Sequence, residues 1–362
     1  MKKLLFIVLV CFFHTAWNWK DFSLKIEPRP ELGIKTEWVV DTVKQGGLRL
    51  DLVNNSPPLV QAELVVQGNA IDGIKAYNKK NGKLVWDFSI PSGVVSPLVL
   101  YKGNIYFGGA DGFFYSLQLK SGLLNWKYFS ASENTSSALI HEDKIYWLAS
   151  NQKLYALDIK GSLLWIYSGP SSKEGFFLHG GARPALYKNT LYVGFQNGSL
   201  LALNRKTGQL QWKRSFSQPI VEDLKISGKC LLVPVFDSHL FCLNRGNGKT
   251  LWKLQGGSAV QHREPFDIYQ FHKGQLYAFK NRKLEWKKKF ESYPFPPSLF
   301  KNYLIYGFPS KGELMILQAK EGHYVEKHKF GKGLAGPAVI QGEDLYFLSV
   351  SSYLHKLKLK AK

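Results

Sequence analysis

Hydrophobic and polar residues alternate along most of this chain in short runs bounded by turn-forming residues. Typical runs are Asn104-Ile105-Tyr106-Phe107-Gly108 and Thr190-Leu191-Tyr192-Val193-Gly194. A period of two, rich in β-branched and aromatic residues, predicts half-buried β-strands. Asp111-Gly112 and Asn197-Gly198 follow these runs and favour the positive φ of tight hairpin turns. The pattern therefore predicts antiparallel hairpins and excludes a helical repeat, whose apolar period would be 3.6.

The same pattern returns along the whole chain at intervals near 40 residues. An apolar residue precedes one turn in each unit, and these residues are Tyr77, Leu117, Leu157, Leu203, Leu243, Phe279, Leu317 and Leu357. The steps between them are 40, 40, 46, 40, 36, 38 and 40 residues. Four short strands in about 40 residues correspond to one blade of a β-propeller. The sequence therefore predicts an all-β, eight-bladed propeller of four-stranded antiparallel blades.

A tryptophan follows the turn in most of these units. The repeated tryptophans are Trp86, Trp126, Trp165, Trp212, Trp252 and Trp286. We interpret them as structural, because a large ring on the outer strand can pack between blades while its indole N–H finds a backbone acceptor. Glu326 replaces the tryptophan of the seventh unit, and the sixth unit is irregular between Gly256 and Tyr277. These two blades should be the least regular.

The eighth unit ends before its fourth strand, since only five residues follow Leu357. A candidate for the missing strand is the segment 33–40, which contains Trp38. We predict that this segment pairs with the C-terminal unit and closes the ring, which removes an edge prone to aggregation. Residues 33–362 would then form a single propeller domain, and the N-terminal strand would be essential for its stability.

The first residues of the chain have the pattern of an export signal. Two lysines precede about ten apolar residues, a run too short for a membrane-spanning helix. We expect a signal peptide over residues 1–16, with cleavage after Ala16, and an N-terminal extension over residues 17–32. Attachment of a lipid at Cys11 is the alternative, although the bulky apolar residues around it do not suit such a site.

Two further cysteines, Cys230 and Cys242, lie in one predicted hairpin. If Asp237-Ser238 is a two-residue turn, directly paired residues have numbers with an odd sum, whereas the two cysteine numbers have an even sum. Their side chains would then point to opposite faces, so we expect free, buried thiols. A disulfide is the alternative, because exported proteins often carry them.

The chain is strongly basic, with 48 Lys and Arg against 27 Asp and Glu and a formal net charge of +21. Basic surfaces attract phosphate, so nucleic acid and an anionic membrane surface are both candidate partners. The export signal argues against nucleic acid and favours the membrane, where each nearby cation contributes up to about 1 kcal/mol. Alternatively, the lysines only keep exposed strands soluble.

No catalytic motif stands out in the sequence. It contains no Gly-Xaa-Ser-Xaa-Gly, His-Glu-Xaa-Xaa-His, Cys-Xaa-Xaa-Cys or phosphate-loop motif, and its nine histidines lack the spacing of metal ligands. The carboxylate pairs Glu222-Asp223 and Glu343-Asp344 suit turns or strand ends better than acid–base catalysis. We therefore expect no enzymatic activity, no cofactor and no metal.

Two units, residues 154–165 and 201–212, resemble the repeat of the pyrroloquinoline-quinone (PQQ) propeller superfamily. One branch, the quinoprotein dehydrogenases, typically has adjacent bonded cysteines, a calcium site and a longer chain, and this sequence lacks the cysteine pair and the length. A PQQ-dependent oxidoreductase is therefore the alternative function, and a propeller that binds glycan or another exported protein is a third.

The other branch is BamB, the accessory propeller of the bacterial β-barrel assembly machinery, which this chain resembles in size, number of units and export signal. The resemblance implies a non-enzymatic periplasmic scaffold at the inner face of the outer membrane, monomeric outside the complex. The implied partners are the barrel-inserting subunit and unfolded outer-membrane proteins, without nucleic acid.

The step of 46 residues adds a segment before the fourth blade, and this segment resembles a partner-binding loop of BamB proteins. The family pattern is Leu-Xaa-Leu-Arg-Gly leading to a proline. Phe176, Leu178, His179 and Gly180 fall on this pattern, so the resemblance implies that they bind the partner. If exposed, the apolar tip Phe176-Phe177-Leu178 beside Arg183 would also suit an interface, and the predicted partner-binding site is Phe176, Phe177, Leu178, His179, Gly180 and Arg183. If buried, the apolar residues would instead plug the mouth of the channel. A second family contact, an acidic pair in the loop before the next blade, is not evident near Ser217-Gln218-Pro219.

Overall fold

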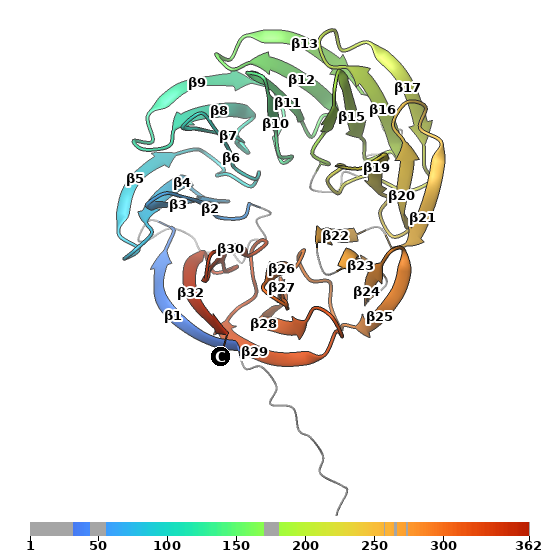
Figure 1. Ribbon diagram of the computed structural model, residues 1–362. Helices are drawn as coiled ribbons and strands as arrows, with labels where there is room; N and C mark the ends of the chain where they lie inside the picture. The colour runs from blue at the N-terminus through green and yellow to red at the C-terminus, as the bar shows by residue number, and fades with distance from the viewer. Residues whose placement is uncertain are drawn as a thin grey trace, which may run out of the picture. The chain divides into compact units, whose positions relative to one another are not determined.

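The computed structural model describes residues 32–43, 56–169, 181–256, 258–263, 266–272 and 274–361, which form eight four-stranded antiparallel sheets. The sheets are blades of a propeller, with the first strand of each blade innermost and the fourth at the rim (Figure 1). This confirms the predicted fold class. The predicted signal peptide, residues 1–16, and the possible lipid site Cys11 lie outside the described residues.

The blades follow one another along the chain. The first four blades contain β2 (Leu59–Gln61), β3 (Leu64–Asn69), β4 (Gly73–Asn78) and β5 (Leu84–Ser89); β6 (Val99–Tyr101), β7 (Asn104–Gly108), β8 (Phe113–Gln118) and β9 (Leu124–Phe129); β10 (Leu139–His141), β11 (Lys144–Leu148), β12 (Lys153–Asp158) and β13 (Leu163–Ser168); β14 (Ala185–Tyr187), β15 (Thr190–Gly194), β16 (Ser199–Asn204) and β17 (Leu210–Ser215). The next three contain β18 (Lys225–Ser227), β19 (Cys230–Pro234), β20 (His239–Asn244) and β21 (Thr250–Gln255); β22 (Ser258–Arg263), β23 (Phe266–His272), β24 (Gln275–Lys280) and β25 (Lys283–Lys289); β26 (Ser298–Phe300), β27 (Tyr303–Phe308), β28 (Lys311–Gln318) and β29 (Tyr324–Gly331). The eighth contains β30 (Val339–Gln341), β31 (Asp344–Leu348), β32 (Tyr353–Ala361) and β1 (Leu32–Asp41).

The eighth blade is completed by β1, which pairs antiparallel with β32. The paired residues run from Leu32 opposite Ala361 to Asp41 opposite Tyr353, and Trp38 lies opposite Lys356. The two ends of the propeller therefore close the ring, as the sequence predicted. The packing follows the same logic, because each hydrophobic cluster joins neighbouring blades; one of them, for example, joins Val66 and Ile74 to Ile105 and Leu117.

The third and fourth strands of every blade are joined with the same irregularity. In the first blade Ala76 lies opposite Trp86 and Tyr77 opposite Leu84, so Val85 has no direct partner. Equivalent one-residue shifts occur in the other seven blades. Such a bulge bends the strand and re-aims the next side chain. Here it directs the tryptophan toward the following blade.

Six of the seven repeated indoles contact the turn between the third and fourth strands of the following blade. Trp38, Trp86, Trp126, Trp165, Trp212 and Trp286 donate their Nε1–H to the carbonyl oxygens of Lys79, Leu119, Ile159, Arg205, Arg245 and Ala319 at 3.0–3.2 Å. A glycine in the same turn has positive φ, and a Cβ on it would lie 2.6–3.1 Å from the indole; these glycines are Gly82, Gly122, Gly161, Gly208, Gly248 and Gly322. Only glycine allows this backbone conformation and this approach together.

Two departures from this arrangement have local causes. Trp252 packs in a cluster with Cys242 and Phe279, and the turn of the next blade, Asn281–Arg282, has positive φ but no glycine. Glu326 replaces tryptophan in the seventh blade because the next blade has no turn to receive it. The third and fourth strands of that next blade, β32 and β1, are the two ends of the propeller and are not joined by a turn.

The sixth and seventh blades are irregular, as the sequence predicted. The pairing of β22 with β23 shifts twice, on either side of Gln261. In the seventh blade the register shifts once between β27 and β28 and twice between β28 and β29.

Cys230 and Cys242 form a disulfide, with their Cα atoms 5.1 Å apart, so the expectation of free thiols is wrong. The error lies in the assumed turn. The Val235 N–H donates to the carbonyl oxygen of His239, which leaves a three-residue turn, 236–238. Paired residues therefore have numbers with an even sum, and Cys230 pairs with Asn244 while Leu232 pairs with Cys242. The cysteines are therefore diagonal neighbours on one face of the hairpin, within reach of each other.

Replacing Gly122 tests the contact between tryptophan and glycine. Gly122 and Gly103 have similar φ values, +71° and +75°, but a Cβ at 122 would lie 2.6 Å from the Trp86 ring, whereas one at 103 meets nothing within 4 Å. Gly103→Ala should cost about 1–2 kcal/mol through backbone strain alone. We expect Gly122→Ala to cost about 1–3 kcal/mol more, because the indole must move. Urea denaturation measures both, and equal losses would contradict this role of the indole contact.

His355 makes the stability of the closing blade depend on pH. Its ring is 8 % exposed and stacks on Phe347 at 4.6 Å between centroids. Burial, with a smaller contribution from His328, lowers the pKa of His355 from 6.5 to about 4. The unfolded chain therefore binds more protons between pH 6.5 and 4, and stability falls as the pH is lowered through this window.

We expect this group to remove at most about 3 kcal/mol between pH 6.5 and 4. His355→Phe keeps an aromatic ring against Phe347 but has no titrating group. The difference in unfolding free energy between wild type and this variant, measured across the window, isolates the histidine from all carboxylates. A difference that does not change with pH would show that His355 is not buried as a neutral ring.

Candidate functional site

The two faces of the propeller carry opposite charge. In an antiparallel blade the first–second and third–fourth turns lie at the same end of the strands. On this face the described turns carry fifteen cations: Lys79, Lys80, Lys83, Lys102, Lys120, Lys160, Lys188, Arg205, Lys206, Lys229, Arg245, Lys249, Arg282, Lys301 and Lys320. They carry five carboxylates, Glu63, Glu142, Asp143, Glu321 and Glu343. We call this face the basic face.

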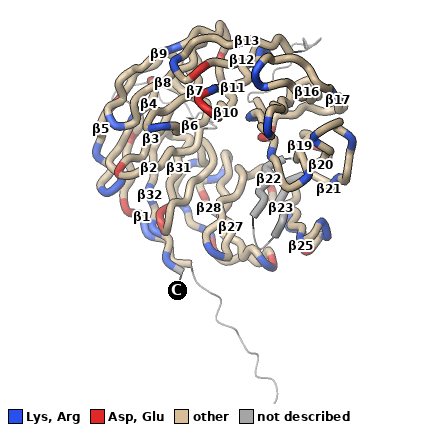
Figure 2. The backbone as a smooth tube through the Cα atoms, turned by 45° about the horizontal axis from the view of Figure 1, so that its top comes forward, with Lys and Arg blue, Asp and Glu red and all other residues tan. Residues whose placement is uncertain are grey.

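The opposite face consists of the second–third turns and the connections between blades. Its described turns and connections carry seven carboxylates, Asp72, Asp111, Glu133, Glu222, Asp223, Asp237 and Glu291, and two cations, Arg183 and Lys332. Among the described turns and connections, positive charge is therefore concentrated on one side. Figure 2 shows many of the Lys and Arg positions at the turns of the outer strands.

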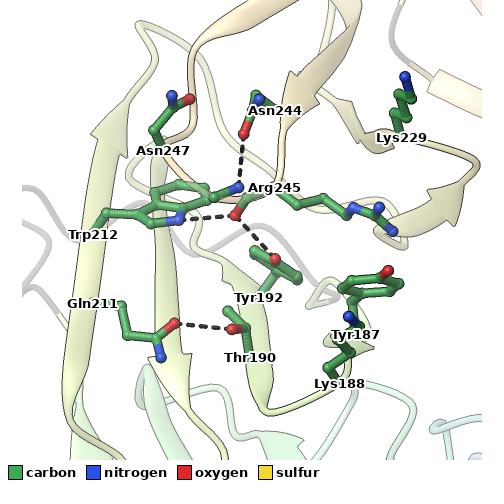
Figure 3. A pocket seen from close by; sticks show the side chains of 11 residues that line it. Tyr187, Lys188, Thr190, Tyr192, Gln211, Trp212, Lys229, Asn244, Arg245 and Asn247 are labelled. Atoms are coloured by element: carbon green, nitrogen blue, oxygen red, sulfur yellow. Dashed lines mark hydrogen bonds between the residues drawn. The ribbon is translucent and has the colours of Figure 1, made fainter.

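A cleft of about 730 Å³ opens between the fourth and fifth blades on the basic face (Figure 3). It is lined by Tyr187, Lys188, Thr190, Tyr192, Gln211, Trp212, Lys229, Asn244, Arg245, Gly246 and Asn247. The lining combines aromatic rings, amides and three cations, and no carboxylate belongs to it. Such a lining suits a small ligand that has an anionic group for the cations and polar groups for the amides.

The backbone of Arg245 is fixed by the structural repeat. Its carbonyl oxygen accepts hydrogen bonds from Trp212 Nε1 and from the hydroxyl of Tyr192, each at 3.0 Å. The Arg245 guanidinium lies 3.5 Å from the centre of the Tyr187 ring, a cation–π contact. The indole contact thus positions a cation at the wall of the cleft (Figure 3).

The cations of this cleft are not neutralised by the described part of the protein. There, Lys188, Lys229 and Arg245 form no ion pair with a carboxylate. A smaller cleft between the third and fourth blades differs, because Arg205 Nη2 lies 2.6 Å from Glu142 Oε2. This pairing lowers the pKa of Glu142. Free positive charge therefore lies in the cleft between blades four and five.

The described residues contain no obvious metal site. Among them, no three His, Cys, Asp or Glu side chains gather as metal ligands would. No helix in the described part of the chain has the length and apolar character that crossing a bilayer requires.

The partner-binding site expected from the sequence is only partly visible. Phe176, Phe177, Leu178, His179 and Gly180 lie outside the described residues, whereas Arg183 is described. The backbone N–H of Arg183 donates to Asp223 Oδ1 at 3.0 Å, and its Nε is buried with no partner among the described residues.

Asp223 and its neighbour Glu222 form one of the acidic pairs that the sequence predicts to lie in a turn or at a strand end. Glu222 and Asp223 lie in the connection between β17 and β18, the loop before the fifth blade. An acidic pair is therefore present in that loop, a few residues beyond Ser217-Gln218-Pro219, where it was not evident from the sequence. The hydrogen bond from Arg183 brings this loop against the end of the connection that precedes β14. The contact with Arg183, which the sequence does not show, relates this acidic pair to the connection before β14.

The family model described as outer membrane protein assembly factor BamB matches residues 35–176 and 173–280. The chain belongs to the BamB family. Among solved structures it is similar to BamB from Moraxella catarrhalis, with a TM-score of 0.74, 18 % identity, and coverage of 90 % of this chain and 100 % of that one. A search of curated proteins finds none that matches the sequence.

Other structures share the fold at lower identity. The quinohemoprotein alcohol dehydrogenase ADHIIG from Pseudomonas putida HK5 has a TM-score of 0.67 and 13 % identity, over 91 % of this chain and 76 % of that one. A computationally designed protein, Ika8, has a TM-score of 0.70 and 14 % identity, over 84 % of this chain and 96 % of that one. These likenesses show the fold alone. Evidence about function comes from the match to the BamB family and from the site.

Proposed function

We propose that this chain is a non-enzymatic scaffold of the outer-membrane β-barrel assembly machinery. The observation that carries the proposal is the match to the BamB family over residues 35–280. The closed ring supports it, because the first strand completes the last blade and the eight blades then form one continuous ring. Such a ring can hold loops in fixed positions for a partner.

The proposed location is the periplasm, at the inner face of the outer membrane. The Cys230–Cys242 disulfide supports it, since stable disulfides belong to oxidising compartments such as the periplasm. The expected signal peptide supports the same location. Cleavage after Ala16 and a lipid on Cys11 remain alternative fates of the N-terminus.

Arg183, the described residue of the proposed partner-binding site, lies on the face opposite the basic face. The site comprises Phe176, Phe177, Leu178, His179, Gly180 and Arg183 from the connection between β13 and β14. The hydrogen bond between Arg183 and Asp223 supports it, because it joins the end of that connection to the acidic pair in the next one. The partners would be the barrel-inserting subunit and unfolded outer-membrane proteins. The scaffold would be a monomer outside the complex.

Crosslinking in the cell envelope followed by affinity capture of this chain tests the proposal. We expect recovery of the barrel-inserting subunit, and at least a tenfold loss of it with Phe176→Asp plus Leu178→Asp, because two charges would replace apolar contacts. Tyr293→Asp is the matched control: it is a 54 % exposed aromatic residue in an equivalent blade connection, and it should leave recovery unchanged. No recovery from wild type, or undiminished recovery from the double variant, would refute partner docking.

A PQQ-dependent oxidoreductase is the second candidate, because solved quinohemoprotein alcohol dehydrogenases share this fold. Thermal denaturation with PQQ and calcium distinguishes the two. A scaffold should melt at the same temperature with and without them, whereas a quinoprotein should be stabilised by at least several degrees when the ligand is well above its dissociation constant. Stabilisation of that size would overturn the assignment as a scaffold.

A further inference from the structure

A belt of exposed apolar side chains follows the rim of the basic face. Its members stand at the start of the fourth strand or just before it, and each is 39–61 % exposed: Leu84, Val85, Leu123, Leu124, Leu163, Leu164, Leu210, Leu251, Leu284 and Tyr324. They come from seven consecutive blades. We call them the leucine belt. Contiguous exposed apolar surface marks interaction sites, and three neighbouring blades each contribute two adjacent members of the belt.

The leucine belt alternates with the cations of the basic face. Lys83 directly precedes Leu84 and Val85, and Lys283 directly precedes Leu284. Similar turns place a cation within a few residues of Leu124, Leu163, Leu210 and Leu251. Lysine stems can lie along apolar surface while the ammonium group reaches outward. Apolar groups ringed by cations match the boundary between lipid headgroups and acyl chains.

The cleft between the fourth and fifth blades gives this face a candidate site for a single anionic headgroup. Lys188, Lys229 and Arg245 line it, and its lining contains no carboxylate. Tyr187 and the amides of Gln211 and Asn247 offer stacking and hydrogen bonds to a polar body next to the anion (Figure 3). A phosphate ester with a glycerol-sized headgroup has this chemistry.

We propose that the basic face binds the surface of an anionic membrane. The leucine belt lies at the level of the headgroups, and the cleft between the fourth and fifth blades receives a lipid phosphate. The acidic character of the opposite face orients the molecule, because an anionic surface attracts one side and repels the other. A nucleic acid would use the cations but would leave the leucine belt exposed.

The ends of the propeller lie on the same side. Leu32, at the start of β1, pairs with Ala361 at the end of β32, in the place of a third–fourth turn. Leu32 and Ala361 therefore both lie at the basic face. The proposed partner site, around Arg183, is then directed away from the membrane. This inference does not depend on the scaffold function.

Vesicle co-sedimentation of the full-length chain tests the proposal. We expect at least tenfold stronger binding to phosphatidylcholine vesicles containing phosphatidylglycerol than to phosphatidylcholine alone, and weaker binding as salt rises. Binding to the neutral vesicles measures the contribution of the apolar N-terminal segment. Equal binding to both vesicles would overturn the proposal.

Matched variants separate the basic face from net charge. Lys188→Glu plus Lys229→Glu should reduce binding to the anionic vesicles at least tenfold. Lys213→Glu plus Lys253→Glu makes the same charge change on the same two blades, farther along β17 and β21, and should reduce it no more than about threefold. Equal losses would show that only net charge matters and would refute a specific face.

The leucine belt and the cleft have their own tests. Leu123→Ser plus Leu163→Ser should weaken vesicle binding severalfold at an unchanged melting temperature, since both side chains are exposed. Glycerophosphoglycerol should compete with the vesicles more strongly than inorganic phosphate at equal charge, and Arg245→Gln should abolish that difference. Tight binding to duplex DNA that is insensitive to the two serines, with vesicle binding equally insensitive, would identify a polyanion site and refute the membrane.

Discussion

The propeller depends on one repeated contact, in which an indole of one blade packs on a glycine turn of the next. Each contact combines apolar burial with a hydrogen bond to a turn carbonyl, for example Trp86 Nε1 to Leu119 O at 3.0 Å. A single blade cannot bury both of its faces, so stability comes from neighbours. Because the contact joins blade to blade at the rim, it also fixes the angle between them. The bulge before each tryptophan is what makes the approach possible.

The same constraint explains where the repeat departs from itself. A tryptophan can make this contact only where the next blade has a turn between its third and fourth strands. In the eighth blade these strands, β32 and β1, are the two ends of the propeller and have no such turn. Glu326 is therefore a consequence of ring closure. The closing blade instead relies on a long β1, which buries Leu32, and on packed rings such as Phe347 and His355. Closure by the two ends of the chain makes the ring cooperative, because the first strand cannot form its blade until the last has been placed.

The sequence predicted those features that a residue type determines locally. Alternating apolar positions, Asp-Gly turns and the tryptophan column identified eight blades and the closing strand at Trp38. The pairing of Cys230 with Cys242 could not be read in this way, because one additional residue in the turn reverses which side chains share a face. Nor could the contact of Arg183 with Asp223, which joins residues 40 positions apart through the path of two loops. The position of a residue within a blade can be predicted from the local sequence. Contacts between loops depend on how the blades are arranged around the ring.

The repeat also determines how charge is distributed in space. Lysine and arginine recur in the third–fourth turns, and every such turn lies on one face because each blade has the same strand order. A small excess of cations in the turns of each 40-residue unit therefore adds up, over eight blades, to a basic face. The longer connections between blades lie on the other face. Variation in turn sequence changes one face and variation in connection length changes the other. A closed propeller can therefore separate an electrostatic surface from a loop-built protein-binding surface without altering the indole contacts that hold both in place.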